Sequence, residues 1–262
     1  MDAFVINLSA AKDRWDHVEK VFAPTAFSLV RVEAVDGNAL TSGVAGYAER
    51  SFFRRHGRTT NLREVACYHS HIRAMRLFLD SGEEHALICE DDIALKTDPA
   101  QIVKRLLDHA GSWDIARLSG LREATGVNAI ALQPGYFLRV NLGRLKGAGA
   151  YFLNRRAARK IAEQLLPMRV PFDHAIDREW VYGLNAVSVS PFPIDQTGVG
   201  FRTSIQRGPA RKLSTFRRLC FTYPYQTVNE VSRWLFRIPR ALVLCWGSSA
   251  ERRGEAIDPI SG

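Results

Sequence analysis

Short apolar runs alternate with segments of helical periodicity along the first two hundred residues. Apolar runs that end at polar or turn residues predict strands over 3–8, 29–35, 86–89, 115–118, 127–132, 136–140, 147–153 and 186–190. Apolar side chains spaced three and four residues apart predict helices over 15–22, 61–79 and 155–166, and Pro167 ends the last of these. Asn61 and Glu64 have the spacing of a capping box. This mixture predicts an α/β fold, a mixed sheet flanked by helices.

One strand lacks the alternation of apolar and polar residues. The run 86–89 is apolar throughout and is bounded by charges, which is typical of a central strand buried on both faces. Glu90, Asp91 and Asp92 follow directly, at the end of a strand where open α/β sheets bind ligands. Three adjacent carboxylates repel one another, and a divalent cation relieves this repulsion. The alternative is a solvated acidic turn.

The net charge of +9 belongs to the C-terminal fifth of the chain. Between residues 202 and 253, eleven Lys and Arg stand against two Glu, a surplus of nine. We expect a main domain over residues 1–204 and a basic, aromatic, helical extension over residues 205–262. The extension either lies on an anionic membrane surface or packs on the main domain with a solvated basic face. We expect no nucleic acid partner, because no nucleic-acid motif accompanies the charge.

The cysteines and the apolar stretches of the sequence indicate the cellular compartment. The four cysteines form no CxxC pair, which favours a reduced protein. The first residues lack the features of a signal peptide, and no apolar stretch reaches the roughly 18 residues of a membrane span. We therefore expect a cytoplasmic location, peripheral on the inner face of the cytoplasmic membrane where the extension contacts lipid.

Several short motifs stand in the order found in glycosyltransferase family 25. They are 5–8 followed by Arg14, 32–37, Glu64 with Cys67, Ser70 and His71, 87–92, 147–153 with Ala157 and Ala158, 171–173, and 193–196 with Ser204. The chain resembles this family, whose members build bacterial lipopolysaccharide or lipooligosaccharide. The resemblance implies a GT-A-like nucleotide-diphospho-sugar transferase fold and inversion at the anomeric carbon. It also implies a UDP-sugar donor, often UDP-galactose, and a saccharide or lipid-linked saccharide acceptor.

The resemblance further implies which residues bind the donor. They are Asn7, Leu8, Arg14, Val35, Asp36, Gly37, Ser70, His71, Glu90, Asp91 and Gly147. The Arg14 guanidinium is a planar fork that matches phosphate oxygens, and an exposed helix position is its alternative. An ordinary turn is the alternative for Asp36 and Gly37, and a structural role is the alternative for His71.

Transfer from a nucleotide diphosphate needs a neutralised leaving group and a base. We expect Asp92, together with Asp91, to bind Mn²⁺ or Mg²⁺ opposite the diphosphate, and Glu90 to orient them. Inversion needs a carboxylate that takes the proton from the acceptor hydroxyl. We assign this role to Asp173, with Asp177 one helical turn later in reserve. The alternative is that Asp173 only caps a helix extending to Tyr182.

Two other functions use similar residues. A catalytically inert relative would bind a nucleotide sugar or glycan without transferring it. A metal-dependent phosphohydrolase also uses clustered acids but usually adds histidine ligands, and the seven His of this chain form no ligand-spaced pair. The sequence favours a metal-dependent glycosyltransferase.

Overall fold

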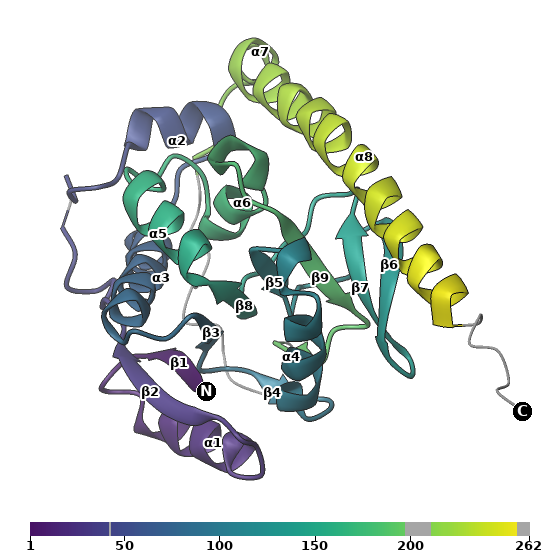
Figure 1. Cartoon of the computed structure of the whole chain (residues 1–262). Helices are drawn as coiled ribbons and strands as arrows, with labels where there is room; N and C mark the ends of the chain where they lie inside the picture. The colour runs from purple at the N-terminus through teal and green to yellow at the C-terminus, as the bar shows by residue number, and fades with distance from the viewer. Residues whose placement is uncertain (42, 197–210, 256–262) are drawn as a thin grey trace, which may run out of the picture.

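The computed structural model describes residues 1–41, 43–196 and 211–255, with side chains described as far as residue 247. Within this part of the chain, eight strands form a mixed sheet in the order β2-β1-β3-β8-β5-β9-β7-β6 (Figure 1). The strands are β1 (Asp2–Asn7), β2 (Ser28–Glu33), β3 (His85–Glu90), β5 (Ile115–Arg117), β6 (Gly126–Gln133), β7 (Tyr136–Asn141), β8 (Ala150–Asn154) and β9 (Ala186–Ser190). The short strands β4 (Ala94–Leu95) and β10 (Ile194–Asp195) pair separately. The predicted α/β fold with a mixed sheet is confirmed.

Pairing is parallel on one side of the sheet and mostly antiparallel on the other. β1 runs parallel to both β2 and β3, and β5 runs parallel to β9. β8 is antiparallel to both of its neighbours, β3 and β5. β7 is likewise antiparallel to β6 and β9. The parallel trio β2, β1 and β3 brings three carboxyl ends to one edge of the sheet.

Helices cover both faces of this sheet (Figure 1). They are α1 (Lys12–Phe22), α2 (Glu49–His56), α3 (Leu62–Asp80), α4 (Pro99–Asp108), α5 (Arg155–Gln164), α6 (Phe172–Ile176), α7 (Thr215–Arg217) and α8 (Tyr223–Glu255). Alternate strand residues supply two apolar cores: Phe4 and Ile88 pack under α3 and α5, whereas Val5 and Cys89 pack under α1 and α4. β3 is therefore buried on both faces, as its uninterrupted apolar run predicts.

Local signals placed most elements correctly and missed a few. Asn61 caps α3, because its side-chain oxygen accepts the Glu64 amide hydrogen bond at 2.9 Å. The sequence did not predict α2, α4, β4 or β10. The expected helix from Asp173 to Tyr182 is also wrong, since α6 ends at Ile176 and only a 3₁₀ turn follows at Glu179–Tyr182.

The C-terminal extension is one continuous helical segment and not a helix pair. α7 leads through a π-helical turn at Arg218–Thr222 into α8, which crosses β6 and β7 (Figure 1). The expected solvated basic face is wrong for α8, because Arg233 and Arg237 are 1% and 2% exposed and point into the protein, whereas Arg211, Lys212 and Arg217 before α8 are exposed. Among the described residues, no helix has both the length and the apolar character needed to cross a bilayer. The expected boundary at 204/205 and Ser204 lie outside the described residues.

Candidate functional site

The motif residues of three strands meet at one edge because β1 lies between β2 and β3 and runs parallel to both. Asn7 ends β1 opposite Glu33 of β2, and Ile6 lies opposite Glu90 at the end of β3. The acidic triplet, Asn7 and the turn at 35–37 therefore lie along the carboxyl edge of these strands. In an open α/β sheet this edge is where ligands bind.

Asp91 joins the motifs of β1 and α1 to the acidic triplet. Its Oδ2 accepts a hydrogen bond from Asn7 Nδ2 at 2.7 Å, and its Oδ1 forms an ion pair with Arg14 Nη1 at 2.6 Å. Arg31 of β2 in turn donates to Asn7 Oδ1. The side chain of Arg14 is only 12% exposed, so the exposed helix position considered for it is wrong. Asp91 thus holds Asn7 and Arg14 in place, and its expected contact with ribose or metal stays a prediction.

Asp92 also lies beside Arg14, but the negative charge of its carboxylate is less fully compensated than that of Asp91. Its Oδ2 is 3.9 Å from Arg14 Nη1, while its buried Oδ1 has no hydrogen-bond partner among the described residues. Burial, together with repulsion from Glu90 and Asp91, raises the pKa of Asp92 to about 7, although Arg14 acts in the opposite direction. A buried carboxylate oxygen without a donor, next to two further acids, fits a hard divalent cation such as Mg²⁺ or Mn²⁺.

Glu90 is held from two sides at the end of β3. His71 Nε2 lies 3.3 Å from its Oε1, and Gln196 Nε2 donates to its Oε2 at 3.1 Å. His71 is 1% exposed, contacts the Tyr151 hydroxyl at 2.9 Å through Nδ1, and stacks on Phe172 with 4.1 Å between ring centroids. Both ring nitrogens of His71 thus have partners, and this histidine positions Glu90.

Ser70 fixes the loop that follows β2. Its buried hydroxyl accepts a hydrogen bond from the Val35 amide at 2.8 Å and donates to the Ala66 carbonyl at 2.8 Å. Gly37 lies against α3, where an added Cβ would come within 2.5 Å of Arg63 Cα. The exposed Asp36 accepts a hydrogen bond from the Asn38 amide, as an ordinary turn does. Leu8 lies in the turn before α1, where its carbonyl accepts the Ala11 amide at 2.8 Å.

Asp173 also lies near the carboxyl edge of β1, β2 and β3, next to the residues that lead into β8. β8 is antiparallel to β3, so the residues before β8 lie beside the acidic triplet, and the Gly149 carbonyl accepts the Glu90 amide at 2.8 Å. Gly147, in the left-handed region with φ +85°, donates to Asp173 Oδ2 at 2.9 Å. Pro171 is the N-cap of α6, so the capping role considered for Asp173 is wrong.

The surroundings of Asp173 favour its carboxylate form. Burial raises the pKa of Asp173, but the nearby His174, the Gly147 amide and Arg117 outweigh it, so that the pKa lies below its ordinary value. The carboxylate is thus ionised at neutral pH. An ionised carboxylate can accept a proton from an acceptor hydroxyl, which is the property that a general base requires.

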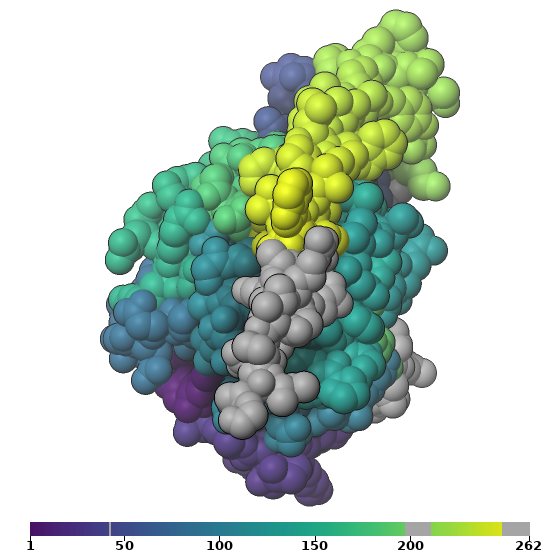
Figure 2. All heavy atoms as spheres, turned by 45° about the vertical axis from the view of Figure 1, so that its right-hand side comes forward, coloured from purple at the N-terminus to yellow at the C-terminus, as the bar shows by residue number. Residues whose placement is uncertain are grey.

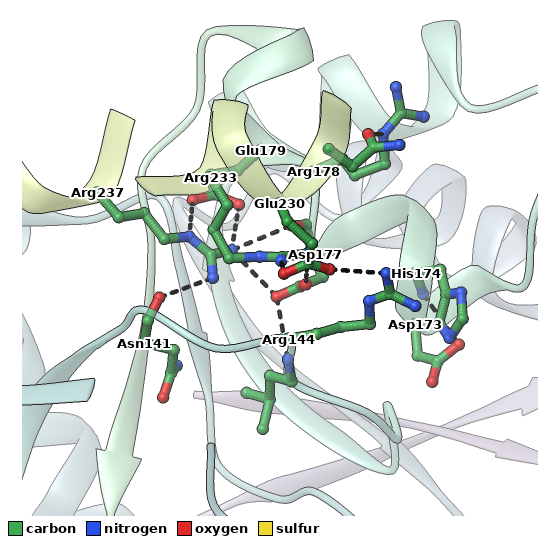
Figure 3. A network of polar contacts seen from close by, with 12 residues as sticks. Asn141, Arg144, Asp173, His174, Asp177, Arg178, Glu179, Glu230, Arg233 and Arg237 are labelled. Atoms are coloured by element: carbon green, nitrogen blue, oxygen red, sulfur yellow. Dashed lines mark hydrogen bonds and ion pairs between the residues drawn. The ribbon is translucent and has the colours of Figure 1, made fainter. Parts of the chain in front are cut away.

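Asp177 lies in a different network. Its two oxygens contact Arg233 and Arg237 of α8 at 2.9 Å and 3.0 Å, and Arg237 also forms a two-pronged pair with Glu179 at 2.6 Å (Figure 3). All four side chains are at most 4% exposed. Asp177, the reserve choice for the base, therefore anchors α8 to the main domain.

Glu90 also belongs to a second group of possible metal ligands, which includes a cysteine and a histidine. Ligand atoms of Cys67, His71 and Glu90 lie within 4.8 Å of one another. Burial raises the pKa of the Cys67 thiol well above its usual value, and nearby carboxylates raise it further. Because the thiolate is the form that binds metal, this trio is a poorer site than Asp92 for a cation that also contacts phosphate oxygens.

Three contacts of the site had no counterpart in the sequence prediction: Arg31 on Asn7, Tyr151 on His71, and Gln196 on Glu90. Gln196 belongs to the motif 193–196, which signals its importance without giving its partner. It also packs on Gly149, where an added Cβ would lie 2.0 Å from Gln196 Cδ. Tyr151 likewise lies within the motif 147–153, whereas Arg31 is an ordinary strand residue in the sequence and carries no such signal.

Comparison with known proteins assigns the chain to a family. The profile of glycosyltransferase family 25, described as a family of LPS biosynthesis proteins, matches residues 1–176. The chain belongs to glycosyltransferase family 25. This family 25 chain is also similar to human procollagen galactosyltransferase 2, with 27% identity over 117 residues that cover 41% of the chain. The match covers only 18% of that longer protein.

Solved structures with a distant likeness to this family 25 chain include two bacterial proteins. One is a protein of Desulfovibrio desulfuricans G20 assigned as a nucleotide-diphospho-sugar transferase, with TM-score 0.34 and 8% identity, covering 71% of this chain and 78% of that one. The other is a protein of Bacillus anthracis assigned as a glucose-1-phosphate thymidylyltransferase, with TM-score 0.35 and 11% identity, covering 88% and 75%.

Proposed function

We propose that this family 25 protein is an inverting glycosyltransferase that moves a sugar from a UDP-sugar to a hydroxyl of a saccharide acceptor. Galactose is the proposed sugar, which the name of the human relative supports. The proposed acceptor is a saccharide of lipopolysaccharide, lipooligosaccharide or a related surface glycan, free or lipid-linked, which the family description supports. The observation that carries the proposal is the only partly compensated Asp92 at the carboxyl edge of β3, with the ionised Asp173 approaching the same edge through Gly147.

The donor site in this proposal is the edge formed by β1, β2 and β3. Asp91 holds Asn7 and Arg14 there, so that the Arg14 guanidinium faces the position of the diphosphate. Asp92 would hold Mn²⁺ or Mg²⁺ through its free Oδ1. The bound cation supplies positive charge that stabilises the departing diphosphate.

Asp173 acts as the base in the proposed reaction. It takes the proton of the acceptor hydroxyl while that oxygen bonds to the anomeric carbon, on the face opposite the diphosphate. The bond between the anomeric carbon and the phosphate oxygen breaks, and UDP leaves with the electron pair. The Gly147 amide holds Asp173 in its orientation through the 2.9 Å hydrogen bond.

A screen of UDP-sugars tests this function. We expect one UDP-sugar to raise the melting temperature in the presence of Mn²⁺ and to be consumed when a saccharide acceptor is added. Binding without turnover on any acceptor would favour an inert glycan-binding relative. Release of free phosphate or sugar without an acceptor would favour a hydrolase.

The outward face of α8 supports a proposed contact with an anionic membrane. Its apolar residues repeat every three or four positions and are between 44% and 80% exposed: Val228, Val231, Leu235, Ile238, Leu242 and Trp246. The helix forms a ridge on the surface of the protein (Figure 2). The four charged side chains of residues 223–247 all contact the main domain, so this ridge is apolar. Apolar surface of this extent marks an interaction site.

Cations at one end of this ridge favour anionic lipid as its partner. Arg211, Lys212 and Arg217 are exposed beside Phe216, which is 75% exposed. Arg54 of α2 joins them, with its guanidinium 4.9 Å from the ring centre of Phe221. Exposed aromatic and aliphatic side chains next to cations are typical of a protein surface that lies on anionic head groups.

A further inference from the structure

A cleft lies beside the proposed base, between α2, α6 and α8. Four arginines, Arg55, Arg144, Arg178 and Arg233, line it together with His56 and His174. His174 directly follows Asp173 in α6, and its ring lies 5.4 Å from that of His56. Figure 3 shows Arg144 and His174 next to Asp177, with Arg178 above them. Asp173 itself does not line the cleft, but it is the chain neighbour of His174, which does.

The positive charge of this cleft is only partly compensated. Arg144 and Arg233 share Glu230, and Arg233 also contacts Asp177. Arg55 and Arg178 instead place their guanidinium groups 5.1 Å and 5.3 Å from the centre of the Tyr225 ring.

Arg178 also donates to the neutral Asn229 side chain at 2.6 Å. Within the described part of the chain, no carboxylate forms an ion pair with Arg55 or Arg178. Two guanidinium groups thus keep capacity for an anion.

Two buried polar groups in the lining also lack partners. Arg233 is 1% exposed, yet its Nε has no hydrogen-bond partner among the described residues, and the same holds for the Tyr225 hydroxyl. Buried donors of this kind are unfavourable unless a ligand satisfies them. Burial, with His174, Arg58 and Arg144 nearby, also lowers the pKa of His56 to about 3, which agrees with a surplus of positive charge.

We propose that this cleft binds an oxyanion group, phosphate or carboxylate, carried by the saccharide acceptor. Arginine forks match the geometry of both groups, and the Arg233 Nε and the Tyr225 hydroxyl, which have no partner among the residues that the structure describes, are further donors. Binding here places the neighbouring sugar hydroxyls next to Asp173. The proposal rests on the proposed glycosyltransferase function and specifies its acceptor as an anionic saccharide.

Titration with simple probes tests the cleft in the full-length protein. With saturating UDP and Mn²⁺ at the donor site, we expect inorganic phosphate and glucose 6-phosphate to bind in calorimetry, and glucose not to bind. Arg55→Gln and Arg178→Gln should each weaken glucose 6-phosphate binding by roughly tenfold or more, the loss of a charged hydrogen bond. Arg54→Gln is the matched control, because it removes the same charge from the same helix outside the cleft, and it should bind as the wild type does.

Tyr225→Phe separates binding from folding. It removes a hydroxyl that has no partner in the described part of the chain, so the melting temperature of the free protein should stay the same or rise while glucose 6-phosphate binding weakens. Equal binding by the wild type and all three cleft variants would overturn the proposal, as would displacement of the probes by UDP. Absence of UDP-sugar turnover with any acceptor, despite intact probe binding, would count against the proposed function and not against the anion site.

Discussion

Replacing Asp92 by asparagine tests the charge imbalance at the end of β3. The substitution keeps the shape of the side chain and removes the negative charge of a carboxylate whose Oδ1 has no hydrogen-bond partner within residues 1–41, 43–196 and 211–255. The pKa of Asp92 rises from 3.8 to about 7 on folding, because burial and the neighbouring Glu90 and Asp91 disfavour its ionised form. The folded protein therefore binds this proton more tightly than the unfolded chain does.

The sign of the pH dependence follows from this shift. As the pH rises from about 4 to about 7, the wild type loses stability, and the loss is complete above pH 7. Three pKa units correspond to at most about 4 kcal/mol at 1.36 kcal/mol per unit. Because Asp92 is 18% exposed and Arg14 lies nearby, we expect Asp92→Asn to gain on the order of 2 kcal/mol at pH 8.

Denaturation in chelator from pH 5 to pH 8 measures this difference. The gain of Asp92→Asn over the wild type should grow with pH, while Asp108→Asn, which alters a side chain 53% exposed at the end of α4, should stay within about 0.5 kcal/mol. A gain that is absent, or equal at pH 5 and pH 8, would refute the reasoning about burial and repulsion.

Adding Mn²⁺ and UDP should make the wild type more stable than Asp92→Asn, which is the reverse of the order expected in chelator. The cation stabilises the wild type through Asp92, whereas the asparagine variant lacks the charge that binds it. We expect transfer by the variant to fall by a factor of more than about 100. Full wild-type activity in excess chelator would remove the cation from the mechanism.

Three further variants test the base, the anchor of α8 and the outer face of this helix. Asp173→Asn should lower kcat by roughly 10² to 10⁴ while UDP and Mn²⁺ still raise the melting temperature, and unchanged kcat would exclude Asp173 as the base. Arg237→Leu should destabilise the protein by about 3–5 kcal/mol in chemical denaturation, because it leaves the buried Glu179 without its ion-pair partner and Asp177 with Arg233 alone. A loss below about 1 kcal/mol would contradict this anchoring role. Leu235→Asp combined with Leu242→Asp should reduce co-sedimentation with anionic liposomes at low salt without changing the melting temperature. Equal sedimentation of variant and wild type, or a change from dimer to monomer instead, would contradict lipid as the partner.

The sequence by itself determined most of the strands, the helices α1, α3 and α5, and the place of the acidic triplet. The uninterrupted apolar run before Glu90 requires a strand buried on both faces, and the capping box at Asn61 fixes the start of α3. Both are local signals, since burial pattern and cap geometry involve residues a few positions apart. The ordered motifs added the candidate donor residues, although not their contacts.

Only the tertiary structure decided which of the carboxylates has a structural role. Asp91 and Asn7 are 84 positions apart in the chain, and the parallel pairing of β1 with β3 brings them together. Asp177 and Arg237 are 60 positions apart, and their ion pair forms because α8 turns its arginines inward across the sheet. The composition of the extension shows its cations but not their direction, because the orientation of a helix depends on the surface it packs against. That packing left Asp173 as the carboxylate beside the site and made the outer face of α8 apolar.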